Sequence, residues 1–195
     1  MSRKIMVLCG SPRKKGNTNR LAQQFVQGAT GAGAEVEVVD AARLEYKTKG
    51  CIACMKCKKS DGFACTIDDE ASPILARIPD AEAIVFATPV YWFSPTAQLK
   101  LLVDRMFSLI KTDPDGQGFH HPMAGKTLAL IATGGGGFED GLNCVDLTFK
   151  TMAGFLGMKY EPFFLPNSPA EPEDIEELAD VLEKVETLGR KLAEG

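Results

Sequence analysis

Hydrophobic and polar residues follow two patterns along this chain. Short continuous apolar runs recur, and each is followed by a segment in which apolar residues return every three or four positions. The runs are typical of buried parallel strands, and the wider spacing is typical of helices that pack on a sheet. Runs at 5–9, 83–88 and 127–133 predict strands, and the more mixed segments 35–40 and 160–165 predict two others. The spaced positions predict helices at 21–29, 71–75, 99–110, 142–156 and 175–192.

The alternation of strands and helices predicts an α/β fold, with one parallel sheet covered by helices on both faces. Pro162 is expected to break the last strand, because proline cannot donate a backbone hydrogen bond. A long irregular segment at about 41–67 interrupts the alternation. A chain of 195 residues can bury roughly 70% of its extended surface in one core. We therefore expect a single domain, 1–195, with a cysteine-rich insertion at about 41–67.

Composition narrows the classes of function. Hydrophobic residues make up 45% of the chain and charged residues 25%, as in an ordinary soluble globule. The net charge of −4 argues against a nucleic-acid partner held by a broad basic face. No apolar run approaches the roughly 20 residues that span a bilayer, and the run at 5–9 is too short for a signal peptide. We expect a cytosolic protein that binds neither nucleic acid nor a membrane.

Three loops are conspicuous, at 11–19, 88–95 and 133–138, and each follows a predicted strand. In parallel sheets ligands bind where loops leave the carboxyl ends of the strands. The second loop places three aromatic residues and two prolines in a short turn, and the third is nearly all glycine. These loops predict an aromatic wall and an edge of exposed amide groups, although the aromatic residues could instead belong to the core.

The first loop has the composition of a phosphate site. Ser11 and Thr18 offer neutral donors, Gly16 lets the backbone pass close to a ligand, and the N–H groups of the following helix point to the same place. The spacing is wrong for a nucleoside triphosphate loop, since five residues separate Gly10 from Gly16 and Asn17 stands where a lysine would follow. No Gly-x-Gly-x-x-Gly motif is present. An ordinary turn with Asn17 as the helix N-cap is the alternative.

Taken together, a phosphate cradle, an aromatic wall and a glycine-rich edge describe a flat ring with a phosphate tail, which fits FMN. Asp40, at the end of the second predicted strand, occupies the place where a Rossmann fold binds a ribose. Without the glycine motif, we interpret Asp40 as a solvated strand end.

The loops resemble those of the NAD(P)H-dependent FMN reductases of flavodoxin-like fold. The matching motifs are Gly-Ser-Pro-Arg followed by Gly-Asn-Thr, Thr-Pro-Val-Tyr, and the pairs Leu99-Lys100 and Asp104-Arg105. The resemblance covers nearly the whole chain. It implies a three-layer sandwich with strand order 2-1-3-4-5, FMN as cofactor, NAD(P)H as cosubstrate, and a homodimer or homotetramer. The implied cofactor-binding residues are Ser11, Arg13, Asn17, Thr18, Asn19, Pro89, Val90, Tyr91, Trp92, Phe93, Thr133, Gly134 and Gly135. The chemistry would take place on the flavin, so no catalytic side chain is expected.

The irregular segment contains a Cys-x2-Cys-x2-Cys-x7-Cys run formed by Cys51, Cys54, Cys57 and Cys65. Three thiols at successive three-residue spacings match iron-sulfur ligation better than zinc knuckles, which usually come as separated pairs. The run resembles that of the iron-sulfur flavoproteins, which implies a [4Fe-4S] cluster held by these four cysteines. Free or disulfide-forming thiols and a zinc site are the alternatives. Five lysines surround the run and could offset cluster charge, dock an acidic donor or be solvated: Lys47, Lys49, Lys56, Lys58 and Lys59.

The expected function is an FMN-dependent oxidoreductase that moves electrons from NAD(P)H or a reduced carrier to a small-molecule or protein acceptor. Two alternatives stay open: an electron carrier served by a ferredoxin-like donor without NAD(P)H turnover, and a regulatory flavoprotein with a thiol or zinc loop. Cys9 and Cys144 are expected to be small buried residues, and His120 and His121 to be ordinary surface. The acidic tract 171–177 is expected to form the first turns of the last helix.

Overall fold

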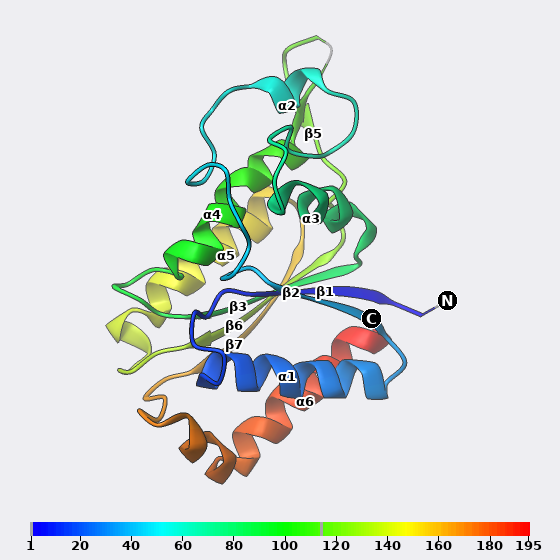
Figure 1. Ribbon diagram of the computed structural model, residues 1–195. Helices are drawn as coiled ribbons and strands as arrows, with labels where there is room; N and C mark the ends of the chain where they lie inside the picture. Colours follow the sequence, from blue (N-terminus) through cyan, green and yellow to red (C-terminus); the bar gives the residue numbers. More distant parts are fainter. Residues whose placement is uncertain (1, 114) are drawn as a thin grey trace.

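A five-stranded parallel sheet forms the centre of the molecule (Figure 1). The computed structural model describes residues 2–113 and 115–195, and the side chains of all of these except 172 and 173. The strands lie in the order β2 (Glu35–Asp40), β1 (Lys4–Cys9), β3 (Ala83–Pro89), β6 (Thr127–Thr133) and β7 (Lys159–Leu165). Counted among the parallel strands this order is 2-1-3-4-5, so the predicted flavodoxin-like fold is confirmed.

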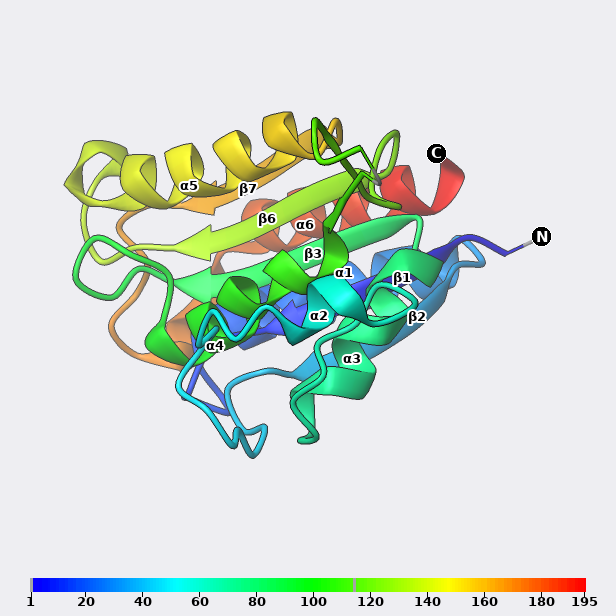
Figure 2. The same ribbon diagram turned by 90° about the horizontal axis from the view of Figure 1, so that it is seen from above.

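Helices cover both faces of the sheet (Figures 1 and 2). On one face lie α1 (Asn17–Gly31) and α6 (Ala179–Glu194). On the other lie α3 (Ala71–Arg77), α4 (Ala97–Arg105) and α5 (Leu142–Phe155). Short 3-10 helices complete the chain: η1 (Ile78–Asp80), η2 (Met106–Leu109), η3 (Phe138–Asp140) and η4 (Pro172–Glu177).

The core is divided into two parts by the sheet. Alternate residues of β1 face opposite sides, so that Met6 and Leu8 belong to one cluster and Ile5 and Val7 to the other. All seven residues of β6 are buried, as expected of a strand covered on both faces. The two helices α1 and α6 approach each other closely: a Cβ atom at Gly28 of α1 would lie 2.1 Å from a backbone oxygen of α6. This packing makes the sheet a rigid base for the loops at its carboxyl end.

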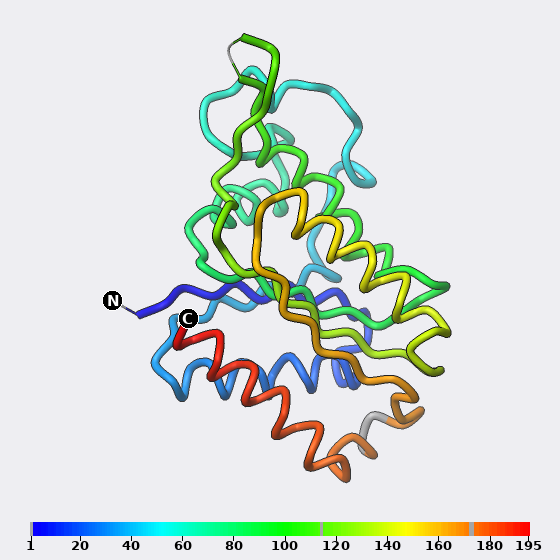
Figure 3. Tube along the Cα trace, turned by 180° about the vertical axis from the view of Figure 1, so that it is seen from behind, coloured from blue at the N-terminus to red at the C-terminus, as the bar shows by residue number. Residues whose placement is uncertain are grey.

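The cysteine-rich segment leaves the carboxyl end of β2 and runs to α3. It contains one short helix, α2 (Lys56–Lys59), and it lies beyond α4 beside an antiparallel hairpin made of β4 (Lys111–Thr112) and β5 (Phe119–His120) (Figures 1 and 3). The sequence pattern did not predict this hairpin, because its strands have two residues each.

Several local expectations were wrong. β7 continues through Pro162, because it lies at the edge of the sheet, where a strand tolerates a missing donor that faces outward. The acidic tract 171–177 forms the 3-10 helix η4, and α6 begins only after Leu178, whose φ and ψ of −93° and 58° are not helical. Cys144 is exposed, since it lies on the outer side of α5. Cys9 is buried as expected, and burial together with Asp40 raises the pKa of its thiol to about 12.

His120 and His121 lie on the surface as expected, and His120 pairs with Asp113 at 2.7 Å. Within the part of the chain that the structure describes, no helix is both long and apolar enough to cross a bilayer.

Candidate functional site

The loops after β1, β3 and β6 meet at one end of the sheet, because these three strands are parallel neighbours. They border an open cavity of about 320 Å³, which is within the usual range for small-molecule sites. The cavity is lined by Ser11, Arg13, Gly16, Asn17, Thr18, Pro89, Val90, Tyr91, Thr133, Gly134, Gly135, Ser168, Pro169 and Ala170. The structure therefore brings together most of the residues that the sequence predicted. That they bind FMN stays a prediction.

The first loop leads into an uncapped helix. Gly16 occupies the N-cap position of α1 with extended backbone, and no side chain accepts a hydrogen bond from the first turn. The leading N–H groups of α1 are thus available to an anion. The loop is also tight, since a Cβ atom at Gly16 would lie 3.0 Å from Cβ of Arg13. The alternative of an ordinary turn capped by Asn17 is wrong, because Asn17 is the first residue inside the helix.

Asn17 connects the first loop to the far side of the cavity. Its Nδ2 donates to Ser168 Oγ at 2.8 Å and to the Pro169 carbonyl at 2.7 Å. The carbonyl can only accept, which fixes the orientation of the Asn17 amide. Its Oδ1 atom is then a buried acceptor that has no partner in the described part of the chain. A buried acceptor at a cavity is suited to a ligand that carries a hydroxyl donor.

Thr18 links α1 to the end of β6. Its hydroxyl lies 2.7 Å from the hydroxyl of Thr133, and both side chains are buried. The Val90 amide in turn donates to the Thr133 carbonyl at 2.8 Å, which ties the second loop to the same strand end. Hydrogen bonds between neighbouring strand ends therefore set the spacing of the three loops before any ligand binds.

The second loop is a tight turn that leaves its aromatic residues exposed. Tyr91 and Ser94 exchange two backbone hydrogen bonds, at 2.9 and 3.2 Å. The two residues between them, Trp92 and Phe93, have φ of 48° and 63°, in the left-handed region. The side chains of Tyr91, Trp92 and Phe93 are 44%, 91% and 54% exposed. The alternative that these aromatic residues belong to the core is therefore wrong.

Three predicted residues do not line the cavity. Trp92 and Phe93 form the tip of the aromatic turn. Asn19 donates from Nδ2 to the carbonyls of Arg13, at 3.1 Å, and Lys14, at 3.4 Å, so it shapes the first loop from behind. Asp40 is exposed, as expected of a strand end, and pairs with Arg43.

The wall formed by Ser168, Pro169 and Ala170 was not predicted from the sequence. The segment after β7 turns back over the glycine-rich loop, where the Ser168 amide donates to the Gly134 carbonyl at 2.8 Å. The strand order could have indicated this wall. β7 is the neighbour of β6, so the loop after the fifth strand also ends at this edge of the sheet.

The cysteine-rich segment holds its thiols unequally. Cys57 is buried in α2 and Cys65 is half-buried, whereas Cys51 and Cys54 are exposed. Among residues 2–113 and 115–195, the structure brings no three His, Cys, Asp or Glu side chains into a metal-binding group. The four thiols are therefore not preassembled. Their role as ligands stays a prediction.

Two lysines tie α2 to its neighbours β4 and η2. Lys111 Nζ donates to the carbonyls of Cys57 and Ser60, the latter at 2.8 Å. Lys58 Nζ donates to the Phe107 carbonyl at 2.6 Å and lies 3.5 Å from the centre of the Phe107 ring. Burial raises the pKa of the Cys57 thiol, and the two ammonium groups act in the opposite direction. A metal that binds Cys57 must first displace this proton.

Comparison with known proteins agrees with the fold. The sequence profile described as NADPH-dependent FMN reductase matches residues 3–165, from the start of β1 to the end of β7. The chain belongs to the NADPH-dependent FMN reductase family.

Two relatives represent the sequence matches. An iron-sulfur flavoprotein of Methanocaldococcus jannaschii is 35% identical over 102 residues, which cover 52% of this chain and 51% of the relative. The match thus spans about half the length of that protein. A Bacillus subtilis protein named as an NAD(P)H-dependent FMN-containing oxidoreductase is 29% identical over 163 residues, 83% of each chain.

Solved structures share the fold at lower identity. An azoreductase from Bacillus anthracis superposes with a TM-score of 0.74 at 19% identity, covering 97% of this chain and 99% of its own. An FMN-dependent NADH-azoreductase from the same species, solved with FMN, gives a TM-score of 0.73 at 17% identity, covering 98% of this chain and 100% of its own.

Proposed function

We propose that this protein is an FMN-dependent oxidoreductase that takes electrons from NAD(P)H or a reduced carrier and passes them to a small-molecule or protein acceptor. The observation that carries the proposal is the cavity bordered by three strand-end loops, with a helix N-terminus on one side and an aromatic turn on the other. Family membership and the Bacillus subtilis relative support it.

Each wall of the cavity has a distinct role in this proposal. Ser11, Thr18 and the free amides of α1 would hold the phosphate, and Asn17 Oδ1 would accept from a hydroxyl of the ribityl chain. Residues 89–91 would lie along the ring, and 134–135 would present backbone amides to its edge. Bound FMN supplies the hydride and electron chemistry at its ring. The protein's task is to bind the ring, orient it and leave one face open.

FMN binding tests this proposal. Purified protein is expected to be yellow, with FMN near one per chain. Replacing both Asn17 and Thr18 with Ala should weaken FMN binding at least about tenfold. Thr18 would lose a hydrogen bond to the charged phosphate, worth about 1.5 to 3 kcal/mol, and Asn17 would lose a neutral one, worth about 0.5 to 1.5 kcal/mol. Thr30→Ala is the matched control, since Thr30 is exposed at the other end of α1 and bonds only within its own helix. An unchanged affinity in the double variant would refute the assignment of the first loop as the phosphate site.

Steady-state oxidation of NAD(P)H separates an enzyme from a carrier. An enzyme should oxidise NADH or NADPH continuously when supplied with a quinone, a nitro or azo compound, or a ferric chelate. A protein that is reduced only by a ferredoxin-like donor would be an electron carrier instead.

We also propose that Cys51, Cys54, Cys57 and Cys65 hold a [4Fe-4S] cluster. The donor set fits in kind and number, since four thiols lie within one segment. Lys111, which bonds to the Cys57 carbonyl, would offset part of the negative charge of the cluster. The names of several relatives, all called iron-sulfur flavoproteins, support the proposal. The cluster would accept electrons one at a time.

Metal analysis of anaerobically purified protein tests the cluster. About four iron and four sulfide per chain are expected, with a low-temperature paramagnetic resonance signal after dithionite reduction. Cys54→Ala should abolish the cluster and leave FMN bound, whereas Cys144→Ala, which removes an exposed cysteine outside the run, should change neither. Protein that carries full FMN but no iron would contradict the cluster, and the same cysteines should then be tested as a zinc site or a thiol pair.

Assembly is a further part of the proposal. The aromatic turn exposes three large side chains next to the cavity, and a second copy of the chain would shelter them and the open flavin face. We expect at least a dimer. Light scattering that gives a monomer at micromolar concentration would overturn this expectation.

A further inference from the structure

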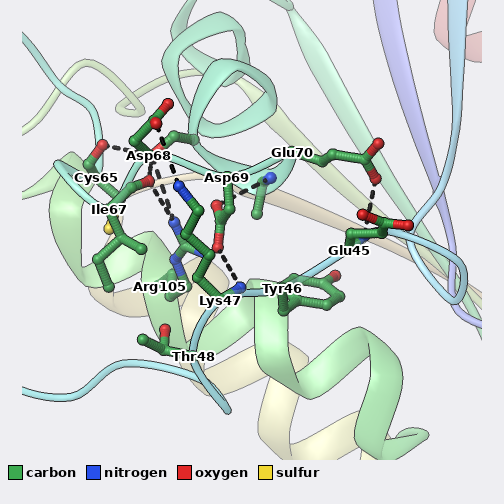
Figure 4. Close-up of polar contacts among 12 residues, drawn as sticks. Glu45, Tyr46, Lys47, Thr48, Cys65, Ile67, Asp68, Asp69, Glu70 and Arg105 are labelled. Atoms are coloured by element: carbon green, nitrogen blue, oxygen red, sulfur yellow. Dashed lines mark hydrogen bonds and ion pairs between the residues drawn. The ribbon is translucent and has the colours of Figure 1, made fainter.

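The two ends of the cysteine-rich segment meet at a buried ion pair (Figure 4). Arg105, the last residue of α4, donates from Nη1 to Asp69 Oδ2 at 2.6 Å. The two side chains are 0% and 1% exposed. Burying two charges is costly, so such a pair persists only where several groups satisfy it at once.

Asp69 holds both ends of the segment. Its Oδ2 accepts a second hydrogen bond, from the Lys47 amide at 3.0 Å, and its Oδ1 accepts from the Ala71 amide at 3.2 Å. Arg105 donates from Nη2 to the Ile67 carbonyl at 3.3 Å. Backbone groups before the first cysteine and after the last one are thus bound to a single pair of side chains. The segment between them is a loop with its base closed by this pair.

The same pair surrounds Cys65. Ser72 Oγ lies 2.6 Å from the Cys65 carbonyl and 3.4 Å from Arg105 Nη2. Arg105 and Ser72 therefore link the ion pair to the backbone of Cys65. Arg105 Nε is also buried, and it has no partner among the described residues. Cys65 is therefore held through its backbone by the groups that close the base of the segment.

The other three thiols differ in how they are held. Cys57 is fixed by the hydrogen bond from Lys111 to its carbonyl. Cys51 and Cys54 are exposed, and the backbone around Cys54 has left-handed residues on either side, Ala53 and Met55, with φ of 51° and 58°. Two thiols therefore lie on anchored backbone and two lie on an exposed stretch.

We propose that Arg105 and Asp69 are positioning residues that set the place of Cys65 and close the base of the cysteine-rich segment. Cys57 and Cys65 form the fixed half of the four-thiol site, and Cys51 and Cys54 close over the ligand held there. This inference rests on the proposed role of the four cysteines as ligands.

Cobalt(II) titration under anaerobic conditions tests the proposal, because thiolate-to-cobalt absorption reports how many thiolates bind. Wild-type protein should bind cobalt tetrahedrally through four thiolates. Arg105→Met should weaken cobalt binding at least about tenfold, a loss of about 1.4 kcal/mol. Arg105→Lys should recover part of the affinity, since lysine keeps a cation that can pair with Asp69. Arg77→Met, which removes a half-exposed pair with Glu37, is the matched control and should bind like the wild type.

Single cysteine variants test the two halves. Cys57→Ser or Cys65→Ser should abolish cobalt binding. Cys51→Ser or Cys54→Ser should leave weaker binding with fewer thiolates in the spectrum. Equal losses at all four positions would contradict the fixed half, although the cluster proposal would stand.

Alkylation of the metal-free protein separates the two proposals. Arg105→Met should raise the rate at which iodoacetamide modifies Cys65, with the exposed Cys144 as an internal control. FMN affinity of the same samples reports whether the fold is intact, and if Arg105→Met does not fold, Asp69→Asn and Arg105→Lys decide. A wild-type protein that binds neither cobalt nor iron refutes the ligand role, while the alkylation rates still decide the positioning. Unchanged cobalt affinity and unchanged Cys65 alkylation in the variants would overturn the positioning role.

Discussion

The cavity at the end of the sheet and the cysteine-rich segment are built in different ways. The cavity is bordered by loops whose spacing is set by hydrogen bonds between strand ends, such as that from the Val90 amide to the Thr133 carbonyl. The segment is fixed at its base and at α2, whereas two of its thiols are exposed. The cavity is therefore preorganised, whereas the cysteine-rich segment leaves half of its four thiols exposed.

The difference follows from where each site lies. Parallel strands bring their carboxyl ends together whatever the loops contain, so a loop site gains its geometry from the sheet. The segment 41–67 has no such frame. Charged side chains take its place: Arg105 of α4, Lys111 of the hairpin, and Lys58 of α2, which bonds to η2. A site of this second kind depends on few residues and is vulnerable to single substitutions.

The largest effect is expected at the buried pair. Arg105→Met leaves the Asp69 carboxylate buried without its cation, and removing one partner of such a pair costs about 3 to 5 kcal/mol. Arg77→Met should cost less than about 1 kcal/mol, because its pair with Glu37 is half-exposed. Urea unfolding followed by circular dichroism measures both. Equal, small losses would show that the segment does not depend on Arg105.

The next effect concerns the preorganised cavity. FMN at about a hundredfold excess over its Kd should stabilise the folded protein by about 2.7 kcal/mol, seen as a higher Tm. The double variant with Ala at 17 and 18 should lose about half of this gain at the same FMN concentration if its binding is tenfold weaker. A Tm that does not change with FMN would contradict the proposal that the preorganised cavity binds it.

Acid provides a graded test of the same pair. Burial raises the pKa of Asp69, but the hydrogen bonds from Arg105 and Lys47 outweigh it and hold the pKa below its ordinary value of 3.8. A carboxylate with a lowered pKa in the folded state stabilises the fold above the unfolded value and loses that contribution as the pH falls through the folded value. The free energy of unfolding should therefore decline below about pH 4, less steeply in Asp69→Asn. Identical slopes in the wild type and in Asp69→Asn would argue against a lowered pKa of Asp69 in the folded state.

The smallest effect is expected at the aromatic turn. Trp92→Gly relieves a left-handed conformation, which costs a non-glycine residue about 1 kcal/mol, and removes a side chain that is 91% exposed. The greater freedom of glycine in the unfolded chain offsets part of the gain, so stability should change by less than about 1 kcal/mol. Thermal unfolding measures the change. A clear loss of stability would instead indicate that Trp92 is covered, as a subunit interface would cover it.

The sequence predicted the sheet because three of its strands are continuous apolar runs, and it predicted the strand order only through the resemblance. The sequence also indicated three walls of the cavity, because each of these three loops directly follows a predicted strand. It missed the fourth wall, Ser168 to Ala170, because nothing local in those residues shows that they fold back over Gly134.

The anchors of the cysteine-rich segment were outside the reach of the sequence. The pairing of Asp69 with Arg105 spans 36 positions, and no periodic pattern relates the two. Lys58 stood among five lysines without any feature to distinguish it, yet its ammonium group binds carbonyls of η2 and the residue after it. Cys144 was wrongly expected to be buried because helical spacing gives the apolar face of α5 but does not say that a cysteine belongs to it.

Pro162 has a consequence for how copies of this protein can meet. An edge strand with a complete row of amide donors is a template on which another chain can add a strand. β7 lacks a donor at its centre, so intermolecular sheet extension there is interrupted, whereas the opposite edge, β2, keeps every donor and exposes Val38. Aggregation through strand addition, if the protein undergoes it at high concentration, should start at β2.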